Sequence, residues 1–207
     1  MKYLLIIILS TILIISCSDN STNEVNSSKE ILPLKVGNFW TYSRQKFSSY
    51  KRDSVTFVDT VNYSVSSSIN LNGENWFFMK FNSMVDEYIY TNRKDGLWCL
   101  YAKDTNNIDL PSAKLFLKFP TKNNDTTTID SGTYKTINVD EYLSTQAGIF
   151  DCIKYSKIEF ERVKNCGLYY SPNVGKVMTE EIIDLKYHDR VWDTTFLQST
   201  LIKYKVK

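Results

Sequence analysis

The segment VNYSVSSSINLNGENWFFMKF, residues 61–81, decides the fold class of this 207-residue chain. Apolar residues alternate with mostly polar ones over residues 61–71, a period of two that gives a strand one apolar face. Asn72 and Gly73 follow, and this dipeptide is a strong signal for a tight hairpin turn. The aromatic-rich stretch 76–81 predicts the returning strand. The segment therefore predicts an antiparallel β-hairpin.

The same pattern continues toward the C-terminus, where all seven glycines lie between apolar-rich stretches. Hairpins are expected around Asp95–Gly96 and Ala147–Gly148. The remaining strand-like stretches are 115–119, 169–186 and 192–206. Residues 122–130 (KNNDTTTID) are polar and predict a loop. These observations predict an all-β fold, one antiparallel sheet of about ten strands.

The composition agrees with this fold class and excludes several others. With 43% hydrophobic and 23% charged residues and a net charge of +2, the chain is typical of a globular protein with a real core. A disordered chain would have a lower hydrophobic content, and a strongly basic nucleic-acid-binding protein would have a larger positive charge. We therefore expect no nucleic-acid partner. The chain has 14 tyrosines and 11 phenylalanines but few alanines, which excludes a helical bundle.

The N-terminus has the features of an export signal. Met1-Lys2-Tyr3 is a short positive start, and residues 4–15 are apolar except Ser10 and Thr11. A helix of that length spans about 18 Å, well short of the roughly 30 Å hydrocarbon core of a bilayer. The segment therefore predicts a signal peptide instead of a membrane span.

The end of this signal, Ile14-Ile15-Ser16-Cys17, resembles the lipobox of bacterial lipoproteins. The resemblance implies a thioether-linked diacylglycerol on Cys17, cleavage that removes residues 1–16, and acylation of the new N-terminus. Several acyl chains would give a stable membrane anchor, whereas one chain binds only marginally. The alternative is an ordinary secretory signal followed by a chance cysteine.

Residues 17–29 are then expected to be the lipidated cysteine and a flexible polar tether, followed by one β domain over residues 30–207. A twelve-residue tether has a reach of about 17–21 Å, which keeps the domain near the bilayer. Asp19 does not directly follow Cys17, so the enterobacterial signal for retention in the inner membrane is not clearly present. The expected location is the outer membrane, on its periplasmic or surface side.

Three further segments carry a family resemblance. PLKVGNFW (33–40), AGIFDC (147–152) and YYSPNVG (169–175) resemble the P-L-x-V-G-N-x-W, A-G-x-F-D-C and Y-x-x-P-x-V-G segments of uncharacterised Gram-negative lipoproteins. The resemblance implies a strongly curved sheet, a half-barrel or open barrel similar to that of periplasmic lipoprotein carriers, and no known activity. Physically, the segments are interpreted as determinants of folding at Gly37, Trp40, Pro172 and Gly175.

Three cysteines, Cys99, Cys152 and Cys166, remain after Cys17 in an oxidising compartment, and they allow one disulfide. If the strands around Cys152 and Cys166 form a simple hairpin, the two lie about ten residues out of register, too far for a bond. A bridge between them would need another arrangement. The other interpretation is three small buried residues.

The sequence contains no local catalytic or metal-binding motif. His188 is the only histidine, and no CxxC, HExxH, nucleophile elbow or phosphate loop is present, so we expect no metal, no cofactor and no enzyme activity. Asp86-Glu87 and Glu180-Glu181 are adjacent carboxylates that would point to opposite faces of a strand. Carboxylates from separate strands could still meet, which leaves an envelope hydrolase as an alternative.

The aromatic content supports two binding hypotheses beside simple core filling. Aromatic side chains that converge inward would line a cavity for an acyl chain or similar ligand, whereas coplanar exposed rings would stack sugars. The expected function is a lipid-anchored envelope lipoprotein with a non-catalytic β domain that binds an apolar ligand or an envelope partner. The alternative is a carbohydrate-binding surface lipoprotein. The aromatic residues concerned are Trp40, Tyr42, Tyr63, Trp76, Tyr88, Tyr90, Trp98, Tyr101, Tyr155, Tyr169, Tyr170, Tyr187 and Trp192.

Overall fold

The structure, a computed structural model, describes residues 29–49, 54–82, 84–102, 108–129, 132–160, 166–188 and 191–207. The predicted signal peptide, Cys17 and nearly all of the tether lie outside the described residues. Within the described ranges no helix is long and apolar enough to cross a membrane.

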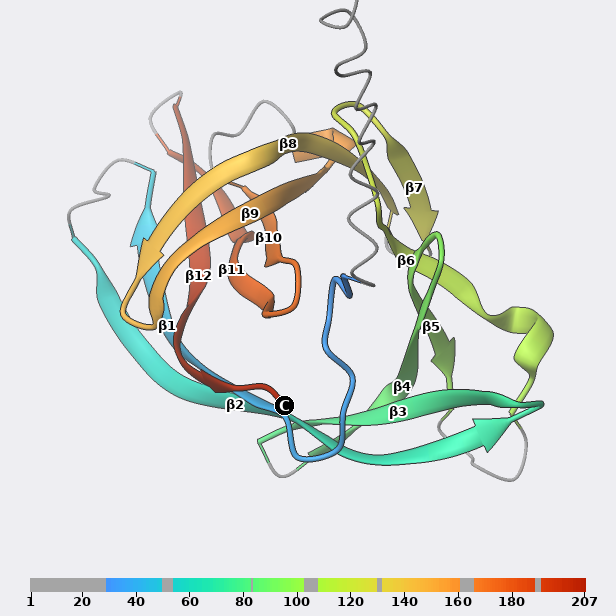
Figure 1. The fold of residues 1–207 in the computed structure, drawn as a ribbon. Coiled ribbons are helices and arrows are strands. Elements are labelled where there is room, and N and C mark those ends of the chain that lie inside the picture. The colour runs from blue at the N-terminus through green and yellow to red at the C-terminus, as the bar shows by residue number, and fades with distance from the viewer. Residues whose placement is uncertain are drawn as a thin grey trace, which may run out of the picture.

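The fold is all-β and consists of one antiparallel sheet of twelve strands (Figure 1). The strands are β1 (Phe39–Ser48), β2 (Thr56–Leu71), β3 (Glu74–Phe81), β4 (Met84–Arg93), β5 (Gly96–Tyr101), β6 (Lys114–Lys118), β7 (Thr126–Ile129), β8 (Gly132–Thr145), β9 (Gly148–Lys157), β10 (Gly167–Ser171), β11 (Gly175–His188) and β12 (Val191–Lys205). Two short 3-10 turns, η1 (Leu110–Ser112) and η2 (Ile158–Phe160), complete the described elements.

The predicted count of about ten strands is slightly low, and one reason is β7. It lies inside the stretch 122–130 that was expected to be a loop. Three threonines and an isoleucine are β-branched and favour extended backbone despite their polarity. Their ladder with β8 pairs Thr128 with Thr133, and the two hydroxyl oxygens lie 3.0 Å apart.

The order of strands in the sheet is β6-β5-β4-β3-β2-β1-β12-β11-β10-β9-β8-β7. Consecutive strands pair throughout except β6 and β7, which form the two edges, and the first strand pairs with the last at the centre. The sheet curls until its two edges approach each other, so that it forms an almost closed barrel (Figure 1). The prediction of a single, strongly curved antiparallel sheet is therefore confirmed.

The segment before β1 runs within the curve of the sheet (Figure 1), and we call residues 29–36 the N-terminal strap. Its Ile31, Leu32 and Leu34 are buried in the main core. The Asn92 side-chain amide donates to the Leu32 carbonyl (2.7 Å), and the Asn173 backbone N–H donates to the Glu30 carbonyl (2.7 Å). The strap is therefore part of the folded core.

A smaller core lies apart from the main one and includes Trp76, Ile89 and Leu100. Arg93 covers it, with its guanidinium carbon 4.3 Å from the centre of the Trp98 ring and 5.4 Å from that of Trp76. The same guanidinium makes two hydrogen bonds to the Glu74 carboxylate, of 2.8 and 2.7 Å. These contacts attach β4 to β3 and to β5.

Candidate binding cavity

The main core borders a cavity of about 210 Å³ that is partly open to solvent. β1 and β2 supply much of its wall, because Trp40 and Tyr42 lie two residues apart on one face of β1 and Tyr63 is paired with Trp40 across the ladder. Tyr90 enters from β4 and Tyr170 from β10. Residues far apart in the sequence therefore meet around one space.

Ring contacts hold these walls in place. Tyr42 and Tyr63 meet edge to face with ring centres 5.6 Å apart. Tyr90 meets Phe116 at 6.2 Å, also edge to face, and Phe116 is a further lining residue. Such aromatic pairs contribute roughly 0.5–1.5 kcal/mol beyond the area that they bury. The wall of the cavity thus consists largely of packed aromatic rings.

Lys176, the second residue of β11, is the cation of this cavity. Its Nζ lies 4.3 Å from the centre of the Tyr63 ring and 5.1 Å from that of Tyr42. Its backbone carbonyl accepts a hydrogen bond from the Tyr42 hydroxyl (2.8 Å). No carboxylate of the described residues lies within ion-pair distance of its ammonium group.

Burial lowers the pKa of Lys176 to about 8, because taking the ammonium out of water disfavours its charged form. The negative charges of Glu181 and Asp86 raise the pKa of Lys176 and offset only part of this effect. The lysine is therefore mostly protonated at pH 7 and mostly neutral well above pH 8.

Asp86 also lines the cavity, and its carboxylate already has partners. It accepts a hydrogen bond from the Tyr90 hydroxyl (3.1 Å) and another from the Tyr88 backbone N–H (3.1 Å). Burial raises the pKa of Tyr90 well above its ordinary value, and the Asp86 charge raises it further. Burial likewise raises the pKa of Tyr42. These tyrosines therefore stay neutral hydrogen-bond donors over the physiological range.

The structure separates Glu180 from Glu181 as expected for neighbours on a strand. Glu180 is fully buried and accepts a hydrogen bond from the Gln198 amide (3.1 Å), whereas Glu181 is exposed. The side chain of Glu87 lies outside the described residues. One member of each pair, Asp86 and Glu181, nevertheless acts on Lys176 from separate strands.

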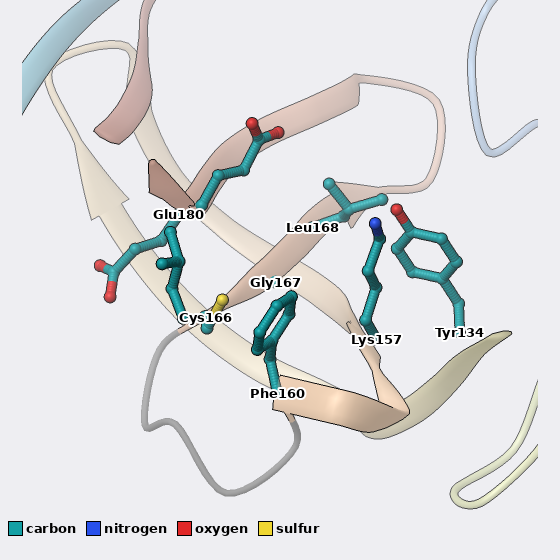
Figure 2. Close-up of a pocket in the computed structure, with 9 residues that line it drawn as sticks. Tyr134, Lys157, Phe160, Cys166, Gly167, Leu168 and Glu180 are labelled. Atoms are coloured by element: carbon teal, nitrogen blue, oxygen red, sulfur yellow. The ribbon is translucent and has the colours of Figure 1, made fainter. Parts of the chain in front are cut away.

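A second pocket of about 210 Å³ lies between β8, β9, β10 and β11 (Figure 2). Figure 2 shows Lys157 beside Tyr134 at one side and Glu180 at the other; the Lys157 Nζ is 5.9 Å from the centre of the Tyr134 ring. Cys166 also lines this pocket, and burial raises the pKa of its thiol. A raised pKa leaves less of the thiol as the nucleophilic thiolate.

Cys99, Cys152 and Cys166 form no disulfide among the described residues, and the last two are buried. Burial raises the pKa of Cys152 to about 12. The β9–β10 ladder pairs Leu168 with Tyr155, which offsets Cys152 and Cys166 by about five residues, or roughly 17 Å. This offset is half the expected one, but it still exceeds the Cα separation of a disulfide.

Among the described residues no group of three or more His, Cys, Asp or Glu is arranged to hold a metal ion. The side chain of His188, like those of Tyr187 and Trp192, lies outside the described residues.

Five of the singled-out aromatic residues are buried in the main core, and Trp76 is buried in the smaller one. Trp40, Tyr42, Trp76, Tyr155, Tyr169 and Tyr170 are buried. The exposed Tyr88 and Tyr101 meet at an interplanar angle of 68°, which is no flat platform for a sugar ring. This arrangement favours the inward-facing cavity over a sugar-stacking surface.

Lys176 is the residue that sequence reasoning missed. The only signal for it was a lysine inside the apolar run Val174–Met178, directly after the turn that ends at Gly175. A charged residue in such a run is informative, because charged side chains are rarely found in strands that pack on a core.

Comparisons with known proteins add little. No family model matches the chain, and no curated protein matches it. Among solved structures, the chain is similar to a protein of Parabacteroides distasonis described as a candidate lipoprotein, with 15% identity and a TM-score of 0.45. It is also similar to a Bacteroides fragilis protein described as a candidate exported protein with a YmcC-like fold, with 12% identity and a TM-score of 0.48. Each comparison covers 86% of this chain and 99% of the other.

Proposed function

We propose that this chain is a lipid-anchored protein of the bacterial cell envelope whose β domain binds a small ligand with an apolar body and performs no catalysis. The observation that carries the binding role is the aromatic cavity around Lys176. The lipobox-like sequence that ends at Cys17 supports the anchor. Outer-membrane attachment, by acyl chains on Cys17, is part of the same proposal.

The size of the cavity limits the ligand. A volume of about 210 Å³ corresponds to roughly seven water molecules at about 30 Å³ each. Pockets for drug-sized ligands are larger, about 300–1,000 Å³. The cavity therefore suits one short acyl chain or one aromatic ring.

The hydrolase alternative receives less support from the same geometry. A glycosidase needs two carboxyl groups on either side of one scissile bond. Asp86 is held by the Tyr90 hydroxyl and the Tyr88 amide, and Glu181 is exposed to solvent. This arrangement provides no pair of carboxyl groups that face each other across a substrate.

The anchor is tested with Cys17→Ala in the native host, with Cys99→Ala as the matched control. We expect the wild type and the control in the membrane fraction, with an acylated N-terminal Cys17 peptide in mass spectrometry. The Cys17→Ala protein should leave the membrane fraction and give no acylated N-terminal peptide. An unmodified Cys17 peptide from the wild type would contradict the anchor.

The binding role is tested by calorimetry with hexanol, hexanoate, benzyl alcohol and benzoate as probes. Phe116→Trp narrows the cavity from the edge strand β6, and Phe119→Trp, which does not line it, is the control. We expect at least one probe to bind at one site per chain, and its affinity to fall in Phe116→Trp only. Absence of binding by all four probes, or equal binding by both variants, would overturn the cavity as the site.

A further inference from the structure

We infer that the ligand of this cavity is a small monoanion, such as a carboxylate with an apolar tail or ring, and that Lys176 holds its charge. This inference rests on the proposed binding function and adds the chemical class of the ligand. It follows from three features of the cavity: a cation without an ion-pair partner, the engagement of the neighbouring acid, and the apolar character of the remaining wall.

The ammonium of Lys176 is the first feature. The Lys176 side chain is partly buried, and removing a cation from water costs free energy unless an opposite charge and hydrogen bonds compensate it. The rings of Tyr42 and Tyr63 supply only cation–π attraction, about 0.5–2 kcal/mol each. Its three N–H groups have no ion pair with the described residues. A ligand carboxylate would supply the missing charge and short, charge-assisted hydrogen bonds.

The neighbouring acids do not fill this role. One oxygen of Asp86 accepts a hydrogen bond from the Tyr90 hydroxyl, and the other accepts one from the Tyr88 N–H. Glu181 is exposed, so water and salt screen its charge. Both carboxylates remain beyond ion-pair distance of Lys176. Their negative charges raise its pKa but do not neutralise the ammonium group.

The rest of the wall sets the shape of the ligand. Trp40, Leu97 and Phe116 present apolar surface to the same space. Pockets of this kind bind an apolar body by burial and orient it with a few polar groups. The tail or ring of the ligand would pack on these three residues while its charged end lies at Lys176.

Proton uptake is a consequence of this arrangement. The charged or titratable groups that face Lys176 come from five strands, and they are Tyr42, Tyr63, Asp86, Tyr90, Tyr170 and Glu181. Burial raises the pKa of Tyr42, Tyr63, Tyr90 and Tyr170, so these four stay neutral while Lys176 titrates. An anion favours protonated Lys176, so binding takes up protons near pH 8 and weakens as pH rises above 8.

The test compares each acid with its neutral amide, which has nearly the same size: benzoate with benzamide and hexanoate with hexanamide. At pH 7 we expect the acid to bind about tenfold to hundredfold more tightly, the range given by a hydrogen bond between charged groups. Lys176→Met should remove this preference. Lys154→Met is the matched control, because Lys154 rests on Tyr169 at 5.4 Å and does not line the cavity. Asp86→Asn should strengthen binding of the acid.

The outcomes separate the two proposals. Equal affinity for acid and amide in the wild type overturns the anion and leaves the binding function standing, and this comparison needs no variant. A preference for the acid that survives Lys176→Met overturns the role of Lys176; Lys176→Gln serves if the methionine variant does not fold. If no acid, no amide and neither alcohol binds, both proposals fail.

Discussion

Gly175 occupies a position where a side chain has no room. Its φ is +97°, and a Cβ there would lie 2.8 Å from Leu32 Cδ1 and 3.3 Å from Trp40 Nε1. We expect Gly175→Ala to lower the free energy of unfolding by roughly 2–4 kcal/mol, from backbone strain and overpacking together. Urea denaturation measures this loss.

Gly73 is the control for this prediction, since its φ is +88° but no atom lies within 4 Å of the added Cβ. Gly73→Ala should lower the free energy of unfolding by only roughly 1–2 kcal/mol, because alanine is strained in the left-handed conformation but meets no neighbouring atom. Equal losses in the two variants would show that contact with the strap and Trp40 is not what selects glycine at position 175.

Trp40 connects β1 to the same turn. Its side chain is 1% exposed, and its indole N–H donates to the Val174 carbonyl. We expect Trp40→Ala to lower the free energy of unfolding by about 3–5 kcal/mol. A Trp40→Ala protein with normal stability would contradict its interpretation as a folding determinant.

Lys176 makes stability depend on pH. Its folded pKa of about 8 lies below the ordinary value for lysine, near 10.4, so the unfolded chain binds more protons between these two values. The free energy of unfolding therefore rises with pH above 8, as Lys176 becomes neutral in the folded protein. The raised pKa values of the tyrosines act in the opposite sense only near and above pH 10.

We predict that wild type gains stability relative to Lys176→Met by about 1–2 kcal/mol between pH 7 and pH 9.5. Urea titrations of both proteins across this range measure the difference. A difference that stays constant with pH would mean that the lysine titrates at its ordinary value.

At the scale of elements, local signals explain which hairpins could be predicted. Asn72-Gly73, Asp95-Gly96 and Ala147-Gly148 each lie at the turn between paired strands, where the sequence placed them. Turn chemistry acts over a few residues, so a single sequence shows it. The polarity of threonine-rich β7 predicts a loop, whereas its β-branched residues favour the extended backbone that the structure shows.

The strap is an element without regular secondary structure, and its apolar residues carry its stability. Ile31 is fully buried and Val36 is 44% exposed. We expect Ile31→Ala to lower the free energy of unfolding by about 2–4 kcal/mol. Val36→Ala should change it by no more than about 0.5 kcal/mol. Thermal and urea unfolding of the two variants check this difference. Similar small losses would mean that the strap does not contribute to the core.

At the scale of the whole molecule, the main core joins both halves of the chain. It includes Trp40 and Val61 from the first half and Val177 and Leu201 from the second. We expect the fragments 29–120 and 121–207 to show no cooperative urea transition when alone, followed by circular dichroism, and to regain one when mixed. A fragment that unfolds cooperatively by itself would contradict a single domain over residues 30–207.

The cavity forms only when the whole sheet is folded, which explains why the sequence did not reveal it. Tyr63, Tyr90 and Lys176 meet only because β1 pairs with β12 and the sheet curls. Neither the pairing of the two ends nor the degree of curvature has a local sequence signal. The inward position of the aromatics was an open alternative in the sequence, and tertiary geometry decides it.

The central β1–β12 pairing also has a consequence for the order of the chain. It joins Phe39 to Lys205, strands from opposite ends of the sequence, while the break in the sheet falls between β6 and β7. A circular permutant with a linker from Lys207 to the strap, opened between β6 and β7, would therefore run β7 to β12 and then β1 to β6. Every strand would pair with its neighbour in sequence, and no native ladder would be lost. Because local contacts close at a lower entropic cost, this rearranged chain should fold faster than the natural one.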